Sequence, residues 1–141
     1  MANGSQTTKT TQPMLELRHI TTNYGAIRAV NEVSLKVNQG EIVSLIGANG
    51  AGKTTLLMTV CGNPRASNGS VWFEGENITN LASHLIMRKG IAISPEGRRV
   101  FPDLTVAENL KMGGFFLENA EIESGMEHVF GLFPRLRERA H

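Results

Sequence analysis

The chain has 141 residues and a formal net charge of +1 at pH 7. It therefore suits one ordinary domain, and its balanced charge does not favour nucleic acid as a partner. Hydrophobic residues make up 40% and charged residues 19%, which supplies a core and excludes general disorder. The single cysteine, Cys61, cannot form an intrachain disulfide, so a reducing, cytoplasmic setting is expected. No apolar run approaches the roughly 18 residues of a spanning helix, and the isolated chain is expected to be soluble.

The predicted elements begin after a polar start. Residues 1–13 offer little to bury and are expected to be a disordered tail or a cloning remnant. Residues 14–141 form the candidate domain. Alternating apolar residues predict half-exposed strands at Leu15 to Leu17 and Val33 to Val37.

The middle and end of the chain alternate between strand and helix patterns. The almost continuously apolar run Ile42 to Ile46 predicts a strand covered on both faces by helices. Thr105 and Glu108 have the spacing of a capping box, so a helix should begin near Val106. The other expected elements are a helix at Leu56 to Cys61, a strand at Val71 to Phe73, a short helix at Leu85 to Arg88, a strand at Ile91 to Ile93, and a helix from Ile122 to Phe133 closed by Pro134.

The most informative motif follows the run Ile42 to Ile46 and precedes a predicted helix. It has the spacing of a phosphate-binding loop: a glycine, four further residues, and then Gly-Lys-Thr. Glycines let the backbone curl so that amide N–H groups face an anion, the lysine reaches the phosphates, and Thr54 can place its hydroxyl on Mg²⁺. The candidate nucleotide-binding residues are Gly47, Ala48, Asn49, Gly50, Ala51, Gly52, Lys53, Thr54 and Thr55.

The loop has three other interpretations. A glycine-rich turn with an incidental lysine would share the spacing but bind nothing. The loop also suits GTP-binding proteins and kinases, because it contacts phosphates and ignores the base. No Asn-Lys-x-Asp motif for guanine occurs in the chain.

Together with Tyr24, the loop resembles the nucleotide-binding subunit of ATP-binding-cassette (ABC) transporters. The segments Ser94 to Pro102 and Met112 to Phe116 are similar to the branched-chain amino acid (Liv-type) subfamily, and the likeness runs from about Met14 to the end of the chain. The resemblance implies an α/β fold: a P-loop NTPase core with an N-terminal antiparallel β subdomain. That fold would be incomplete here, because the C-terminal half of the family is missing.

The resemblance also implies roles for single residues. Tyr24 matches the aromatic residue that stacks on adenine, with a tyrosine packed on the core as the plainer alternative. Glu96 stands where most of the superfamily has a glutamine that senses the γ-phosphate, and its carboxylate is a second candidate Mg²⁺ ligand. Arg98, Arg99 and Phe101 match the segment that contacts the membrane permease, with a solvated basic loop as the alternative.

Residues that hydrolysis requires are missing from the sequence. The only aspartate, Asp103, follows Phe101-Pro102 and so cannot end a buried strand as the Mg²⁺-orienting aspartate does. The signature Leu-Ser-Gly-Gly and the switch histidine of the family are also absent. We therefore expect the first half of a longer protein, inactive alone and less stable than its length suggests.

The function implied by the resemblance is that of an ATP-binding subunit that energises branched-chain amino acid uptake, with ATP and Mg²⁺ as ligands. Its expected partners are membrane permease subunits, a second related ATP-binding subunit and, indirectly, a periplasmic amino-acid-binding protein. Its expected location is peripheral, on the cytoplasmic face of the inner membrane. One alternative is a module that captures ATP or ADP without hydrolysis. Another is a soluble cassette protein of DNA repair or translation, which the permease-like stretch Pro95 to Phe101 disfavours.

Overall fold

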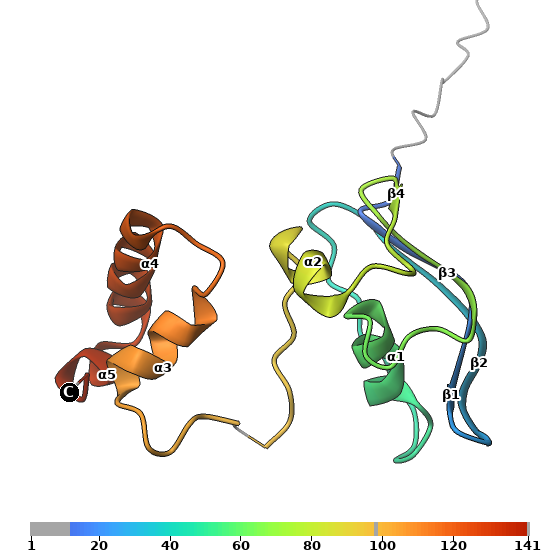
Figure 1. Ribbon diagram of the computed structural model, residues 1–141, viewed down its shortest axis with the longest axis horizontal. Helices are drawn as coiled ribbons and strands as arrows, with labels where there is room; N and C mark the ends of the chain where they lie inside the picture. Colours follow the sequence, from blue (N-terminus) through green and yellow to red (C-terminus); the bar gives the residue numbers. More distant parts are fainter. Residues whose placement is uncertain (1–11, 98, 141) are drawn as a thin grey trace, which may run out of the picture. The chain divides into compact units, whose positions relative to one another are not determined.

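The computed structural model describes residues 12–97 and 99–140, and Figure 1 shows their helices and strands. Two compact units divide between Ile93 and Ser94, and they are called the first and the second unit below. Most of the predicted tail, residues 1–11, lies outside the described residues.

The first unit is built on an antiparallel sheet. Its strands are β1 (Leu15–Tyr24), β2 (Ile27–Val37), β3 (Asn68–Phe73) and β4 (Glu76–Asn77), in the order β2-β1-β3-β4. The strands predicted from alternation are confirmed, and both β1 and β2 are longer than the alternating pattern indicated. The antiparallel β subdomain expected for the fold is therefore present.

Strand β1 departs from regular alternation where it pairs with both of its neighbours. Register shifts interrupt its pairing with β2 and β3 between Leu17 and Asn23. Because such bulges insert extra residues into one strand, consecutive side chains can turn to the same face. Ile20, Thr21 and Thr22 are consequently buried one after another.

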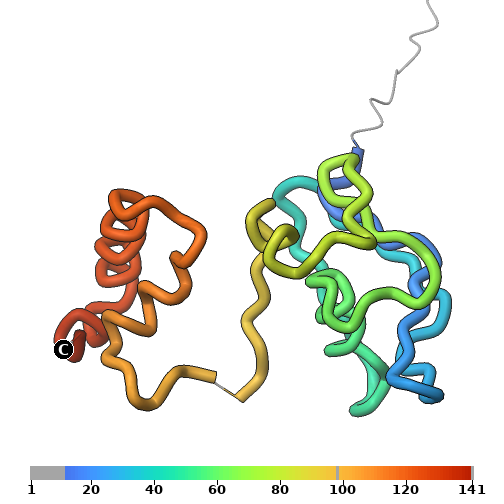
Figure 2. The backbone as a smooth tube through the Cα atoms, viewed as in Figure 1, coloured from blue at the N-terminus to red at the C-terminus, as the bar shows by residue number. Residues whose placement is uncertain are grey.

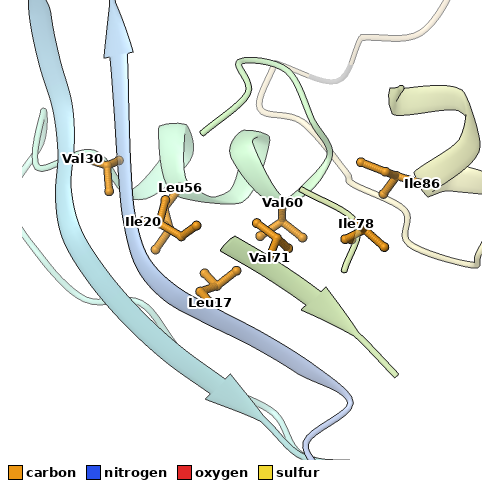
Figure 3. Close-up of a cluster of buried hydrophobic side chains, with 8 residues drawn as sticks. All are labelled: Leu17, Ile20, Val30, Leu56, Val60, Val71, Ile78 and Ile86. Carbon is orange, nitrogen blue, oxygen red and sulfur yellow. The ribbon is translucent and has the colours of Figure 1, made fainter. Parts of the chain in front are cut away.

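Two helices accompany the sheet: α1 (Lys53–Val60) and α2 (Ser83–Arg88). The helix predicted near residue 56 is confirmed, as is the short helix that ends at Arg88. Figure 3 shows side chains from the sheet, from α1 and from α2 in one buried cluster. The cluster comprises Leu17, Ile20, Val30, Leu56, Val60, Val71, Ile78 and Ile86. This core fixes α1, and with it the loop that leads into α1, against the sheet.

The prediction of strands at Ile42 to Ile46 and at Ile91 to Ile93 is wrong. Both segments are irregular, and the sheet of the described chain contains neither of them. Ile42 and Ile46 are each 95% exposed, whereas Val43 and Leu45 are half-buried. A strand covered on both faces depends on parallel neighbours for its backbone hydrogen bonds. Instead, Leu45 packs against the buried cluster that includes Leu56 and Val60 of α1, whereas Ile42 and Ile46 stay in water.

The second unit consists of the helices α3 (Val106–Gly113), α4 (Asn119–Leu132) and α5 (Pro134–Glu138), whose succession can be followed along the tube in Figure 2. The predicted capping box is confirmed: Thr105 Oγ1 accepts from the Glu108 N–H at 3.2 Å. The predicted end of α4, just before Pro134, is confirmed as well. Pro134 opens the short helix α5, which the pattern did not predict. None of the helices in residues 12–97 and 99–140 has the length and apolarity that a membrane span requires.

Candidate functional site

The glycine-rich loop joins the irregular run after Glu41 to the start of α1. Gly50 and Gly52 have φ values of 81° and 86°, in the left-handed region that side chains disfavour. A Cβ on Gly52 would stand 2.3 Å from the backbone oxygen of Ala29 in β2. The C-terminal end of the loop thus lies directly against β2, at a distance that only glycine permits.

Lys53 closes the loop on itself. Its Nζ donates to the carbonyl oxygens of Gly47 and Ala48, each at 2.8 Å. The Ala51 N–H also donates to the Ala48 oxygen, at 3.2 Å. The ammonium group is therefore held at the first residues of the loop, six positions before Lys53 in the sequence. Its positive charge is concentrated there.

The N-terminus of α1 is suited to an anion. The first turn carries no acidic residue, and no side chain caps it. The first amide N–H groups of a helix lack intrahelical acceptors, and the helix dipole adds partial positive charge at this end. Thr54 lies in this turn with an exposed side chain. Loop, lysine and helix start therefore fit phosphate groups, and the Thr54 hydroxyl fits a phosphate-bound cation.

Tyr24 lies at the end of the β1–β2 hairpin that borders this loop. It pairs with Ile27 and is 51% exposed, so it is not enclosed in the core, and its stacking role stays a prediction. Ala29, two residues beyond Ile27, is the residue that Gly52 approaches. The Tyr24 end of the hairpin is therefore the end next to the loop, which leaves the ring available to a flat ligand.

A buried polar contact between β1 and α1 was not predicted from the sequence. The hydroxyls of Thr22 and Thr59 lie 3.0 Å apart, with the two residues 0% and 3% exposed. Thr59 also donates to the Thr55 carbonyl at 2.8 Å. The sequence signal was weak: Thr22 lies two residues after the apolar Ile20 in a strand that also carries several polar residues, and its partner is known only once α1 packs there.

The other predicted site residues belong to the second unit. Glu96 is exposed, and its carbonyl oxygen accepts from Arg99 Nε at 3.3 Å. Arg98 lies outside the described residues. Arg99 and Phe101 are both exposed. Glu96 and the loop belong to different units, and the role of Glu96 at the phosphates stays a prediction.

Asn109 holds the loop that carries Phe101, a role that no sequence pattern indicated. Its Oδ1 accepts from the Phe101 N–H at 2.8 Å, and its Nδ2 donates to the Phe101 carbonyl at 3.0 Å. Nδ2 also lies within 3.1 Å of the carbonyls of Leu104 and Thr105. The loop borders a groove of about 610 Å³ whose lining is mostly apolar and includes Val100, Phe101, Leu104, Leu110, Met112 and Leu136.

Comparison with known proteins gives consistent matches. The model of a family described as ABC transporter matches residues 30–139. The high-affinity branched-chain amino acid transport ATP-binding protein BraG of Pseudomonas aeruginosa is 57% identical over 126 residues, covering 89% of this chain and 54% of that protein. The xylose import ATP-binding protein XylG of Shigella flexneri serotype 5b is 44% identical over 110 residues, covering 75% of this chain and 21% of that protein. The chain thus spans about half of BraG and a smaller share of XylG.

Solved structures match over most of the chain. A nucleotide-free ATP-binding cassette from an ABC transporter has a TM-score of 0.76 at 27% identity, over 92% of this chain and 56% of that one. An ATP-binding subunit of an ABC transporter has the same TM-score at 29% identity, over 90% of this chain and 52% of that one. The fold is accordingly a partial ATP-binding cassette that covers about half of those chains.

Proposed function

This chain belongs to the ABC transporter family, and on that premise we propose that it binds MgATP through Gly47–Thr55 as the ATP-binding subunit of a branched-chain amino acid importer. The observation that carries the proposal is the loop itself: Lys53 is poised over two carbonyls at the uncapped start of α1. The substrate class is supported by the 57% identity to BraG, whose name states branched-chain amino acid transport.

Four residues have a proposed role in binding. Lys53 releases the carbonyls of Gly47 and Ala48 and pairs with the phosphate oxygens, which are better acceptors because they are charged. Thr54 would hold Mg²⁺ through its hydroxyl, and the chemistry that Mg²⁺ would supply there is neutralisation of phosphate charge. Tyr24 stacks on the adenine ring. Glu96 is proposed to approach the γ-phosphate side of the site as a ligand to Mg²⁺ or to water.

This chain alone is proposed to capture nucleotide without hydrolysing it. Phosphoryl transfer in this fold uses an aspartate at a strand end to orient Mg²⁺. The chain's single aspartate, Asp103, lies in the turn after Phe101-Pro102 and is exposed. Its own residues therefore supply a phosphate cradle but not a hydrolytic centre.

The test is isothermal titration of the purified chain with MgATP, together with a phosphate-release assay. We expect saturable binding and no phosphate release. Lys53→Ala should weaken binding at least about tenfold, because a hydrogen bond to a charged group contributes roughly 1.5–3 kcal/mol. Lys36→Ala is the matched control, since Lys36 is exposed and bonds Glu16 on the sheet at 3.1 Å. Equal affinity of wild type and Lys53→Ala would refute the proposed site.

The second unit is proposed to contact the permease. An exposed aromatic residue beside an apolar groove whose lining includes Arg99 has the composition of an interface anchor, and Arg98 precedes Arg99 in the sequence. The further proposed partners are a second related ATP-binding subunit and, through the permease, a periplasmic amino-acid-binding protein. The proposed location is then peripheral, on the cytoplasmic face of the inner membrane.

A pull-down with detergent-solubilised branched-chain amino acid permease tests this surface. Phe101→Ser should reduce retention of the chain, whereas Phe115→Ser should not, because Phe115 is exposed on the same unit but does not line the groove. Equal retention of both variants would place the contact elsewhere.

A further inference from the structure

We propose that the buried hydroxyl pair of Thr22 and Thr59 positions Tyr24 relative to the phosphate loop, and thereby sets how much the base adds to nucleotide affinity. The inference rests on the proposed function, because it takes Tyr24 as the base-stacking residue and Lys53 as the phosphate-binding one. Neither threonine would touch the nucleotide. They are positioning residues that act through the strand and the helix that carry them.

The direction of the hydrogen bonds follows from the number of available hydrogens. Thr59 has one hydroxyl hydrogen, and it donates this hydrogen to the Thr55 carbonyl at 2.8 Å. The 3.0 Å contact between the two hydroxyls must therefore be a donation from Thr22 to Thr59. A directed chain runs from β1 through both hydroxyls to the backbone of α1.

These two hydrogen bonds connect the two parts of the proposed site. Thr55 lies in the first turn of α1, two residues after Lys53, so its carbonyl belongs to the helix start that faces the phosphates. Thr22 lies two residues before Tyr24 and is the last buried residue of β1, because Asn23 and Tyr24 are exposed. The pair is thus the closest buried anchor to the ring along β1.

The apolar residues around Thr22 and Thr59 stabilise the contact between the two hydroxyls. Ile20, Val30 and Leu56 are buried in the same core, with α1 packed on the sheet as Figure 3 shows. In an apolar interior, an unsatisfied hydroxyl costs more than in water, so the pair resists separation. The adenine and the phosphates of a nucleotide are joined covalently through the ribose, so the distance that they can span is limited. A link that fixes β1 against α1 therefore selects ligands that reach both Tyr24 and the loop.

The experiment compares MgATP with Mg-tripolyphosphate, which has the phosphates but no base. Thr22→Val keeps the shape and removes the donor. We expect it to lower ATP affinity roughly tenfold, within the range that base stacking contributes, and to leave tripolyphosphate affinity within about twofold. Thr22→Ser, which keeps the hydroxyl, should restore the wild-type ratio of the two affinities.

Thr21→Val is the matched control for general destabilisation. Thr21 is the neighbouring buried threonine, and its hydroxyl accepts from the Glu32 N–H at 3.2 Å, within the sheet instead of toward α1. This variant should leave the affinity ratio unchanged. In a Tyr24→Ala background, Thr22→Val should no longer change the ratio, because the residue through which it acts is gone.

The outcomes separate this inference from the proposed function. Wild type that binds neither ATP nor tripolyphosphate would overturn the proposed function, and this inference with it. Wild type that binds both, with an unchanged ratio in Thr22→Val, would overturn the positioning role alone. Should Thr22→Val not fold, as judged by the fluorescence of Trp72 in β3, Thr22→Ser and Thr22→Ala would be compared instead, and an equal ratio in both would likewise overturn the role.

Discussion

Each of the two units is stabilised internally in a different way. The first unit buries eight apolar side chains in one cluster shared by the sheet, α1 and α2. In the described part of the second unit, only Gly114, Phe130 and Ala140 are buried. Its large exposed apolar side chains include Phe101, Met112, Phe115, Leu132 and Phe133. Hydrogen bonds at the surface, such as the capping box and the Asn109 contacts, hold much of this unit.

The difference indicates that the two units serve different purposes. A packed core fixes backbone positions to a fraction of an ångström, which a loop of left-handed glycines requires. A unit with little buried apolar area keeps its surface free for a partner and depends on that partner for further stability. Substitutions in the first unit should therefore have large effects on the free energy of unfolding, and these effects should spread through the core. Substitutions in the second unit should have smaller and local effects. The chain's one tryptophan, Trp72 in β3, reports on the first unit by fluorescence.

The largest expected effect is in the core of the first unit. Ile20 is 0% exposed, and Ile20→Ala should lower the free energy of unfolding of this unit by about 2–5 kcal/mol through lost burial and the cavity left behind. Urea titration followed by Trp72 fluorescence measures the change. Phe115→Ala, at a side chain 71% exposed in the second unit, should change it by less than about 0.5 kcal/mol. Similar losses in both variants would contradict the contrast between the units.

The second effect concerns the loop's contact with β2. Gly52→Ala would combine a strained φ with a clash against Ala29, so we expect a loss of about 2–3 kcal/mol and no nucleotide binding. Gly50→Ala is the matched variant: its φ is similar, but nothing lies within 4 Å of the added Cβ. It should cost about 1 kcal/mol from strain alone. Equal losses in the same fluorescence titration would show that backbone strain, and not the approach to β2, explains glycine at residue 52.

The sequence predicted those features of the fold that depend on local pattern. Alternation gave β1 and β2, and the spacing of Thr105 and Glu108 gave the start of α3, because each of these signals is contained within a few residues. The run Ile42 to Ile46 was predicted as a strand from its apolarity, and this was wrong. A central parallel strand is stabilised by its neighbours, and no pattern within five residues says whether those neighbours are present.

The candidate site shows the same limit. The loop motif fixed which residues form the phosphate cradle, since its chemistry needs those residue types at that spacing. The approach of Gly52 to Ala29, and the pairing of Thr22 with Thr59, join residues that are 23 and 37 positions apart. Such contacts follow from how α1 packs on the sheet and from the bulges of β1, neither of which leaves a local trace in the sequence.

A smaller and local effect is expected at the loop of the second unit. Asn109→Ala removes one acceptor and the amide donor from the loop of Phe101 and should cost about 1–2 kcal/mol, confined to this unit. Hydrogen exchange should rise in residues 99–105 and stay unchanged in β1. Asn109→Asp keeps the acceptor for the Phe101 N–H and should give an intermediate increase. A rise in β1 as well would show that the two units are coupled.

The smallest effect should depend on pH. Hydrogen bonds from the Thr105 N–H, at 2.8 Å, and from its hydroxyl, at 2.9 Å, lower the pKa of Glu108 below its ordinary value, and Lys111 adds a weaker attraction. Because the pKa is lower in the folded state, the carboxylate stabilises α3 above its ordinary pKa, and this contribution is lost as the pH falls through the folded-state value.

Glu108→Gln removes the titrating charge and keeps an acceptor, so its deficit relative to wild type should be present near pH 6 and shrink as the solution is acidified. Urea titrations followed by far-UV circular dichroism at several pH values measure the deficit, with Trp72 fluorescence reporting the first unit separately. Glu123→Gln, at an exposed position of α4, is the control for a general loss of negative charge. A Glu108→Gln deficit that is constant with pH would mean that the geometry of the capping box, and not its charge, holds the start of α3.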